Sequence, residues 1–257
     1  MSTLPDVLWL NASPSLQGFD RPLLRVLSRQ VPIAHWQYCQ TQDEPTCLEV
    51  ALDLLHEYVG DRPVHLLGHS TSGLLGLLYA RRYPAQVKSL TLLAVGIHPA
   101  INWQSHYYVL LKLLPCSRKT ILTQMVHNLF GYQSKPISQN LVTTLERDLE
   151  NSLSPHSLFQ PVSIPPARVP VPLFVGGSQD DMVVDPQQIE GWRRWGVGTD
   201  SPSRWQDCPA QSSRLWQCST GRHFFHYFYP TLVGEQILNF WTQLQALPMD
   251  IPLSTTA

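Results

Sequence analysis

The segment of residues 64–82 constrains the fold of this chain most strongly. It begins with the apolar run Val-His-Leu-Leu, which predicts a buried strand, and ends with an apolar helical pattern over 72–82. Between the two lies Gly-His-Ser-Thr-Ser-Gly, residues 68–73. So short a passage from strand to helix needs small residues and holds Ser70 in a strained backbone conformation. We therefore expect the Ser70 hydroxyl to project above the end of a strand.

The same alternation of strand and helix runs through most of the chain. Further short apolar runs predict strands at 7–10, 33–38, 87–95, 172–175 and 214–218. Helical patterns are found at 22–30, 48–59, 187–195 and 232–244. Alternation of this kind is typical of a parallel sheet. We therefore expect an α/β fold with a mostly parallel central sheet flanked by helices.

Residues 97–168 break the alternation. They contain no convincing strand, and helical stretches occur near 103–114, 119–130 and 138–153, separated by prolines. Neighbouring parallel strands need only a dozen or so connecting residues. A connection this long, with apolar helical faces of its own, predicts an inserted helical cap at 97–168. The core domain would then comprise residues 1–96 and 169–250, followed by a frayed tail at 251–257.

Composition excludes several classes of function. The formal net charge of −1 argues against a nucleic-acid partner. The five cysteines are odd in number and include no CxxC pair, so neither a disulfide framework nor a metal site is expected. No signal-peptide pattern and no apolar run of about 20 residues is present, so we expect a cytoplasmic protein without a transmembrane segment. Charged residues make up only 14%, which fits apolar partners or nearby membranes, although we favour a compositional bias of the host.

The order of these elements, with the serine turn at residues 68–73, resembles the α/β-hydrolase superfamily along nearly the whole chain. The family order is serine, then acid, then histidine. The resemblance implies that Ser70 is the nucleophile, Asp180 the orienting acid and His223 the base. One departure is Ser72, which stands where the motif has glycine.

Two segments carry the acid and the histidine. Asp180 follows a strand in a Gly-x-x-Asp turn before an apolar pair, and Asp181 beside it remains a rival for the same role. Asp185, before Pro186, is better interpreted as a helix N-cap. His223 lies in Thr-Gly-Arg-His-Phe-Phe after the last expected strand, similar to the family's histidine loop.

The oxyanion hole should combine two backbone N–H groups. The first is that of Thr71, at the start of the helix behind Ser70. The second should come from the turn after the first strand, where the chain has Asn-Ala-Ser-Pro at 11–14. Alignment with a frequent family proline favours Ser13, although Ala12 stays open.

These features predict a serine hydrolase that works through an acyl-enzyme without a cofactor. Apolar stripes on the expected cap helices favour a hydrophobic acyl, aromatic or isoprenoid-like small-molecule ester. The C-terminal part is slightly similar to type II thioesterases, so release of acyl groups from coenzyme A or a carrier protein is the alternative. Carbon–carbon bond cleavage and a non-catalytic binding protein of the same fold also stay open, as does the oligomeric state.

Overall fold

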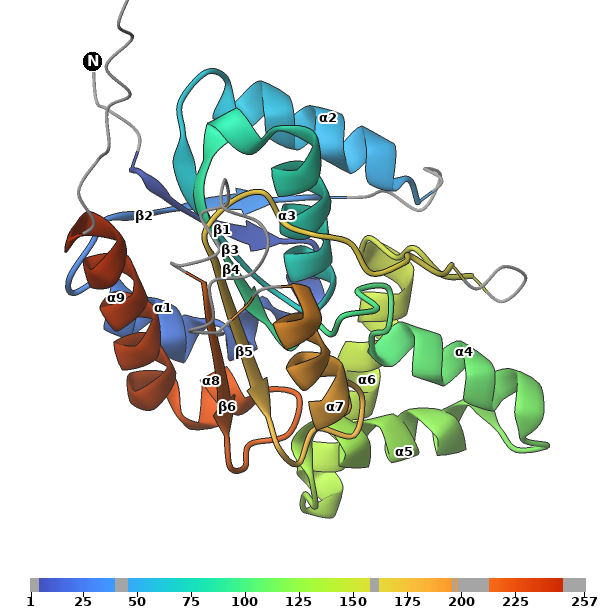
Figure 1. Cartoon of the computed structure of the whole chain (residues 1–257). Helices are drawn as coiled ribbons and strands as arrows, with labels where there is room; N and C mark the ends of the chain where they lie inside the picture. The colour runs from blue at the N-terminus through green and yellow to red at the C-terminus, as the bar shows by residue number, and fades with distance from the viewer. Residues whose placement is uncertain (1–4, 40–45, 158–161, 196, 198–212, 247–257) are drawn as a thin grey trace, which may run out of the picture.

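A computed structural model describes residues 5–39, 46–157, 162–195, 197 and 213–246 of the chain (Figure 1). Its centre is a six-stranded sheet with strand order β2-β1-β3-β4-β5-β6. Every pair of neighbouring strands is parallel. The strands are β1 (Val7–Asn11), β2 (Ile33–Gln37), β3 (Val64–His69), β4 (Val87–Leu93), β5 (Leu173–Ser178) and β6 (Arg214–Cys218). The predicted α/β fold with a parallel central sheet is confirmed.

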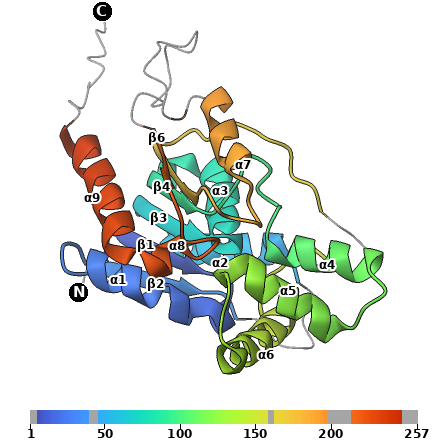
Figure 2. The same cartoon turned by 90° about the horizontal axis from the view of Figure 1, so that it is seen from below.

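Helices cover both faces of this sheet (Figures 1 and 2). One face carries α1 (Arg21–Leu27), α8 (Phe225–Phe228) and α9 (Pro230–Ala246), and the other α2 (Leu48–Val59), α3 (Thr71–Arg82) and α7 (Pro186–Glu190). Successive residues of β1 point to opposite faces, so Leu8 and Leu10 join one apolar core while Val7 and Trp9 join the other. Burial on both faces explains the apolar runs of the inner strands β1 and β5, whereas the edge strands β2 and β6 are only partly buried.

Three helices lie in the chain between β4 and β5. They are α4 (Trp103–Leu113), α5 (Arg118–Phe130) and α6 (Lys135–Asn151). They lie together at one side of the sheet (Figures 1 and 2). The N–H of Leu153, just after α6, donates to the Ala12 carbonyl at 3.0 Å and so ties this group to the turn after β1.

Several helix and strand boundaries differ from those predicted from the sequence. The helix predicted at 187–195 is split into α7 and a 3₁₀ segment, η3 (Gly191–Trp195). Two further 3₁₀ segments are η1 (Pro14–Phe19) and η2 (Pro84–Gln86). The predicted tail at 251–257 lies outside the described residues.

None of the helices among the described residues is both long and apolar enough to cross a membrane. The four cysteines in the described ranges are all free thiols: Cys39, Cys47, Cys116 and Cys218.

Candidate active site

Ser70 occupies the turn between β3 and α3. Its backbone has φ 51° and ψ −121°, a conformation that non-glycine residues rarely adopt. A Cβ added at Gly68 would lie 2.6 Å from the backbone of Ser72 and Gly73, and one at Gly73 would lie 2.6 Å from Val95 Cγ2. The turn therefore needs glycine at both positions, and it holds the Ser70 side chain at the carboxyl end of the sheet.

Ser72 has a structural use where the motif has glycine. Its hydroxyl oxygen accepts a hydrogen bond from the Ala12 N–H at 2.9 Å. This buried bond joins the first turn of α3 to the turn that follows β1. The substitution therefore adds a link between two segments that line the site.

Ser70 and His223 line the same small cavity, of about 20 Å³, and the polar atoms concerned are Ser70 Oγ and His223 Nε2. Both atoms are buried, and neither has a hydrogen-bond partner among the described residues. A buried polar atom without a hydrogen-bond partner lowers the stability of the fold, so two of them at one cavity indicate a functional site. A hydroxyl and an imidazole nitrogen are the atoms that a nucleophile and its general base present, and their contact commonly tightens only when substrate binds.

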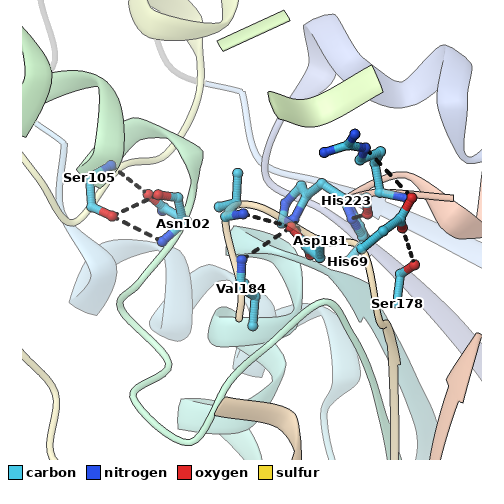
Figure 3. Close-up of polar contacts among 10 residues, drawn as sticks. His69, Asn102, Ser105, Ser178, Asp181, Val184 and His223 are labelled. Carbon is cyan, nitrogen blue, oxygen red and sulfur yellow. Dashed lines mark hydrogen bonds and ion pairs between the residues drawn. The ribbon is translucent and has the colours of Figure 1, made fainter. Parts of the chain in front are cut away.

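Asp181, not Asp180, accepts from the histidine. Asp181 Oδ2 lies 2.9 Å from His223 Nδ1, and the side chain of Asp181 is 1% exposed. Its other oxygen, Oδ1, accepts the backbone N–H groups of Val183 at 2.8 Å and Val184 at 3.1 Å (Figure 3). These bonds hold the carboxylate so that it fixes the Nδ1–H tautomer of His223 and leaves Nε2 free to take a proton.

The prediction that Asp180 contacts His223 is wrong. Its Oδ1 accepts the Ser178 hydroxyl and the Arg222 N–H, both at 2.7 Å, and its Oδ2 accepts the Thr220 hydroxyl at 3.0 Å. Burial raises the pKa of Asp180, but these hydrogen bonds outweigh it and the net shift of the pKa is downward. Asp180 therefore joins the turn after β5 to the loop before His223, and its 33% exposed side chain bonds to these groups rather than to the ring.

The predicted oxyanion donor at Ser13 is not free in this structure. The Ser13 N–H donates to Asn11 Oδ1 at 3.0 Å, and the Ala12 N–H is taken by Ser72. The Thr71 N–H lies in the first turn of α3, where backbone N–H groups have no partner inside the helix. A substrate oxygen could therefore use the Thr71 N–H directly. The N–H groups of Ala12 and Ser13 could bind it only after their hydrogen bonds to Ser72 and Asn11 break.

Three further buried groups support the histidine loop: His69, His226 and Asp20. His69 Nε2 lies 2.9 Å from the His223 carbonyl oxygen, and His226 Nε2 lies 3.0 Å from Asp20 Oδ1. Burial, followed by the nearby His226 and His223 rings, holds the pKa of His69 well below its usual value. The ring is therefore neutral at pH 7, and its Nε2–H can donate to the carbonyl. In the sequence, the feature that indicates a role for His69 near the site is its position directly before Ser70.

Asp20, His69 and His226 also have the spacing of metal ligands. One ligand atom from each lies within 4.8 Å of the others. Asp20 lies directly before α1, but its side chain makes no cap hydrogen bond and binds His226 instead. Because these bonds already occupy the carboxylate and two ring nitrogens, we interpret the group as support for the His223 loop.

A second, larger cavity of about 490 Å³ lies among α4, α5 and the segment around His156. Its walls are largely apolar, formed by residues such as Ile101, Tyr108 and Leu110. His106, from the same wall, donates to the Val183 carbonyl. Burial lowers the pKa of His106, with a further contribution from the charge of nearby His223. His106 therefore lies between the larger cavity and the His223–Asp181 pair.

Helix α4 also contacts the nucleophile turn. Asn102, its N-cap, donates from Nδ2 to the Thr71 hydroxyl at 3.0 Å. The side-chain oxygen and the backbone N–H of Asn102 form a capping box with Ser105 (Figure 3). Trp103 lines the small cavity, and the Phe130 ring of α5 stacks on Phe224 with ring centroids 4.7 Å apart. Helix α4 thus contacts the residue after Ser70, and α5 packs on the residue after His223.

Comparison with known proteins identifies the family. A family model described as the alpha/beta hydrolase fold matches residues 32–123. An uncharacterized protein of Synechocystis sp. is 45% identical over 241 residues, which cover 93% of this chain and 91% of that protein. The chain belongs to the α/β-hydrolase family.

Solved structures show the same fold at low sequence identity. A membrane phospholipase A superposes with a TM-score of 0.67 at 16% identity, over 96% of this chain and 81% of that one. A putative lipase from Acinetobacter baumannii gives a TM-score of 0.65 at 17% identity, over 95% and 86% of the two chains. At such identities the likeness concerns the fold alone.

Proposed function

We propose that this α/β-hydrolase is a serine hydrolase that cleaves carboxylic esters with a hydrophobic acyl or aromatic part. The observation that carries the proposal is that Ser70 and His223 line one small cavity, where Ser70 Oγ and His223 Nε2 are buried without hydrogen-bond partners, with Asp181 on the opposite ring nitrogen. A serine that only stabilised the turn would not need a strained backbone in a cavity shared with an imidazole nitrogen that has no hydrogen-bond partner.

In the proposed reaction, Ser70 Oγ attacks the ester carbonyl carbon while His223 Nε2 takes the hydroxyl proton. Asp181 stabilises the imidazolium that forms, because its Oδ2 lies 2.9 Å from His223 Nδ1. The Thr71 N–H stabilises the tetrahedral oxyanion, a contribution of about 3–4 kcal/mol for one well-placed donor. His223 then gives its proton to the leaving alcohol, and water hydrolyses the acyl-enzyme by the same steps.

The larger cavity supports a hydrophobic substrate. We propose that residues 97–168 act as a cap whose cavity holds the apolar part of the ester, with His106 at the end nearest His223. A volume of about 490 Å³ is within the ordinary range of small-molecule sites, about 300–1,000 Å³. Access to Ser70 then requires the contacts of Trp103 and Phe130 to loosen, because the cavity at the nucleophile holds little more than one water molecule.

The test is turnover of p-nitrophenyl esters of increasing acyl length, with labelling by a fluorophosphonate. The wild type should hydrolyse the esters and gain one label on the peptide that contains Ser70. Ser70→Ala should lose both properties while its melting temperature stays close to that of the wild type. Label on another residue, or ester turnover by Ser70→Ala at the wild-type rate, would show that the nucleophile is misassigned. Faster turnover of matched thioesters would move the substrate class to the thioesterase alternative.

A further inference from the structure

The connection between α4 and α5 forms an exposed apolar tip, which we define as residues 112–119. It projects away from the sheet at the edge of the molecule in both views (Figures 1 and 2). Leu113 is 69% exposed and Leu114 47% exposed, and every residue of the tip is exposed. Two adjacent leucines at a protruding turn are unfavourable in water, so this surface is suited to an apolar partner.

The charges of the tip all have one sign. Lys112, Arg118 and Lys119 belong to it, and the sequence contains no aspartate or glutamate between Asp61 and Glu146. None of the three basic side chains forms an ion pair with a described residue. On a chain whose net charge is −1, the tip is therefore a local basic surface and complements an anionic one.

The tip adjoins the mouth of the larger cavity. Val109 and Lys112 line that cavity, and both are exposed, so the cavity reaches the surface beside the leucines. His106, which also lines the cavity, lies near the His223–Asp181 pair. An apolar molecule that leaves a surface touched by the tip would thus enter a cavity that leads toward Ser70.

We infer that the tip docks this protein onto an anionic lipid bilayer, from which the cavity takes a lipid ester. Leu113 and Leu114 enter the interface between headgroups and acyl chains, while Arg118 and Lys119 meet lipid phosphates. Apolar burial combined with basic side chains is the combination that holds proteins at anionic membrane surfaces. The docking stands on the exposed tip alone, whereas the lipid ester substrate rests on the proposed function.

Flotation of the full chain with vesicles tests the docking. Vesicles of equal parts phosphatidylcholine and phosphatidylglycerol should bind the wild type, and pure phosphatidylcholine vesicles or 0.5 M salt should weaken binding. Arg118→Gln with Lys119→Gln should reduce the affinity roughly thirtyfold, from about a factor of five per basic residue near the surface. Leu113→Ser with Leu114→Ser should reduce it by roughly tenfold or more.

Matched controls lie elsewhere on the surface. Val50 and Leu54 on α2 are 49% and 46% exposed, but Glu49 and Asp53 accompany them. The pair Val50→Ser with Leu54→Ser should therefore bind vesicles like the wild type. The pair Arg21→Gln with Arg25→Gln, on α1, should do the same. If the wild type does not bind the phosphatidylglycerol-containing vesicles, or if the control pairs weaken binding as much as the tip pairs, the docking inference is overturned.

Activity separates this inference from the proposed function. The two tip pairs do not line the cavity, so they should keep wild-type turnover of a short soluble ester while losing turnover of a long-chain ester presented in vesicles. Ser70→Ala should bind vesicles normally and cleave neither ester. Loss of all activity with normal binding would refute the proposed function alone. A concentration-dependent dimer that the leucine pair abolishes would show that the tip binds a second copy instead, which would overturn the docking.

Discussion

Asp148, on α6, should make the stability of this protein fall as the pH rises. Its side chain is fully buried, and neither carboxylate oxygen has a hydrogen bond of ordinary geometry with a described residue. Burial raises its pKa from 3.8 to about 7, although polar groups of Trp103, Ser152, Ser13 and Gln104 offset part of the effect. The folded protein therefore holds a proton that the unfolded chain has lost by pH 5.

The size of the effect follows from this difference in pKa. About three pKa units correspond to about 4 kcal/mol, at about 1.36 kcal/mol per unit. The folded state binds more protons than the unfolded state between pH 4 and 7, so the free energy of unfolding falls across that range and levels off above it. With Asp148 present, the protein is thus about 4 kcal/mol more stable below pH 4 than above about pH 7, where the buried carboxylate is ionised.

Asp148→Asn should remove this dependence, because an amide of the same shape stays neutral and supplies N–H donors in place of the carboxyl O–H. Gln104 Oε1, which also lacks a partner among the described residues, is a nearby acceptor for it. Urea unfolding should show the variant more stable than the wild type at pH 8, by up to about 4 kcal/mol, with little difference near pH 4.

Asp61→Asn, at an exposed position, is the control and should leave the pH dependence unchanged. A difference between Asp148→Asn and the wild type that is constant from pH 5 to 8 would refute the raised pKa. So would a variant that is less stable than the wild type at pH 8.

Two further substitutions test the links around the nucleophile turn. Ser72→Ala leaves the Ala12 N–H without its acceptor and should lower the free energy of unfolding by about 1–3 kcal/mol in urea titration, whereas Ser28→Ala, on the surface, should have little effect. Gly73→Ala places a Cβ 2.6 Å from a side-chain carbon and 2.9 Å from a backbone oxygen, so it should lower the melting temperature by several degrees. Gly18→Ala, with nothing within 4 Å of the new Cβ, is its control, and equal melting temperatures for the two variants would contradict the packing argument.

The sheet could be predicted because burial on both faces leaves a strong sequence signal. The run around Leu8 is apolar at nearly every position, and the segments around Leu66 and Leu90 are rich in leucine, as expected of parallel strands covered by two helical layers. The turn at Ser70 was predictable for a related reason, since only glycine and small residues fit so tight a passage between β3 and α3.

The acid and the oxyanion turn could not be predicted as well, because side-chain direction in a turn depends on tertiary contacts. Asp180 and Asp181 are adjacent and have the same chemistry. What separates them is that Thr220 and Arg222 lie beside Asp180, while His223 lies beside Asp181. Periodicity decides direction in strands and helices, but it says nothing about two neighbours in a turn.

The turn after β1 was predicted as a free donor for the same reason. Nothing in the order Asn-Ala-Ser-Pro shows that Asn11 turns its side chain back onto the Ser13 N–H. Short polar side chains often bond to backbone groups two residues away, so the asparagine was a signal that a local acceptor was present. Ser72, sixty residues further along the chain, carried no such local signal for Ala12.

The most direct test of the central claim compares the two acids by turnover of one soluble p-nitrophenyl ester. If Asp181 orients His223 and Ser70 is the nucleophile, Asp181→Asn should lower kcat by roughly 10⁴, since the amide favours the wrong histidine tautomer. Asp180→Asn should lower kcat less than about tenfold, because its partners are Ser178, Thr220 and Arg222 rather than the ring. Both variants should be checked for folding by their melting temperatures. Equal losses in kcat, or a larger loss in Asp180→Asn, would contradict the account.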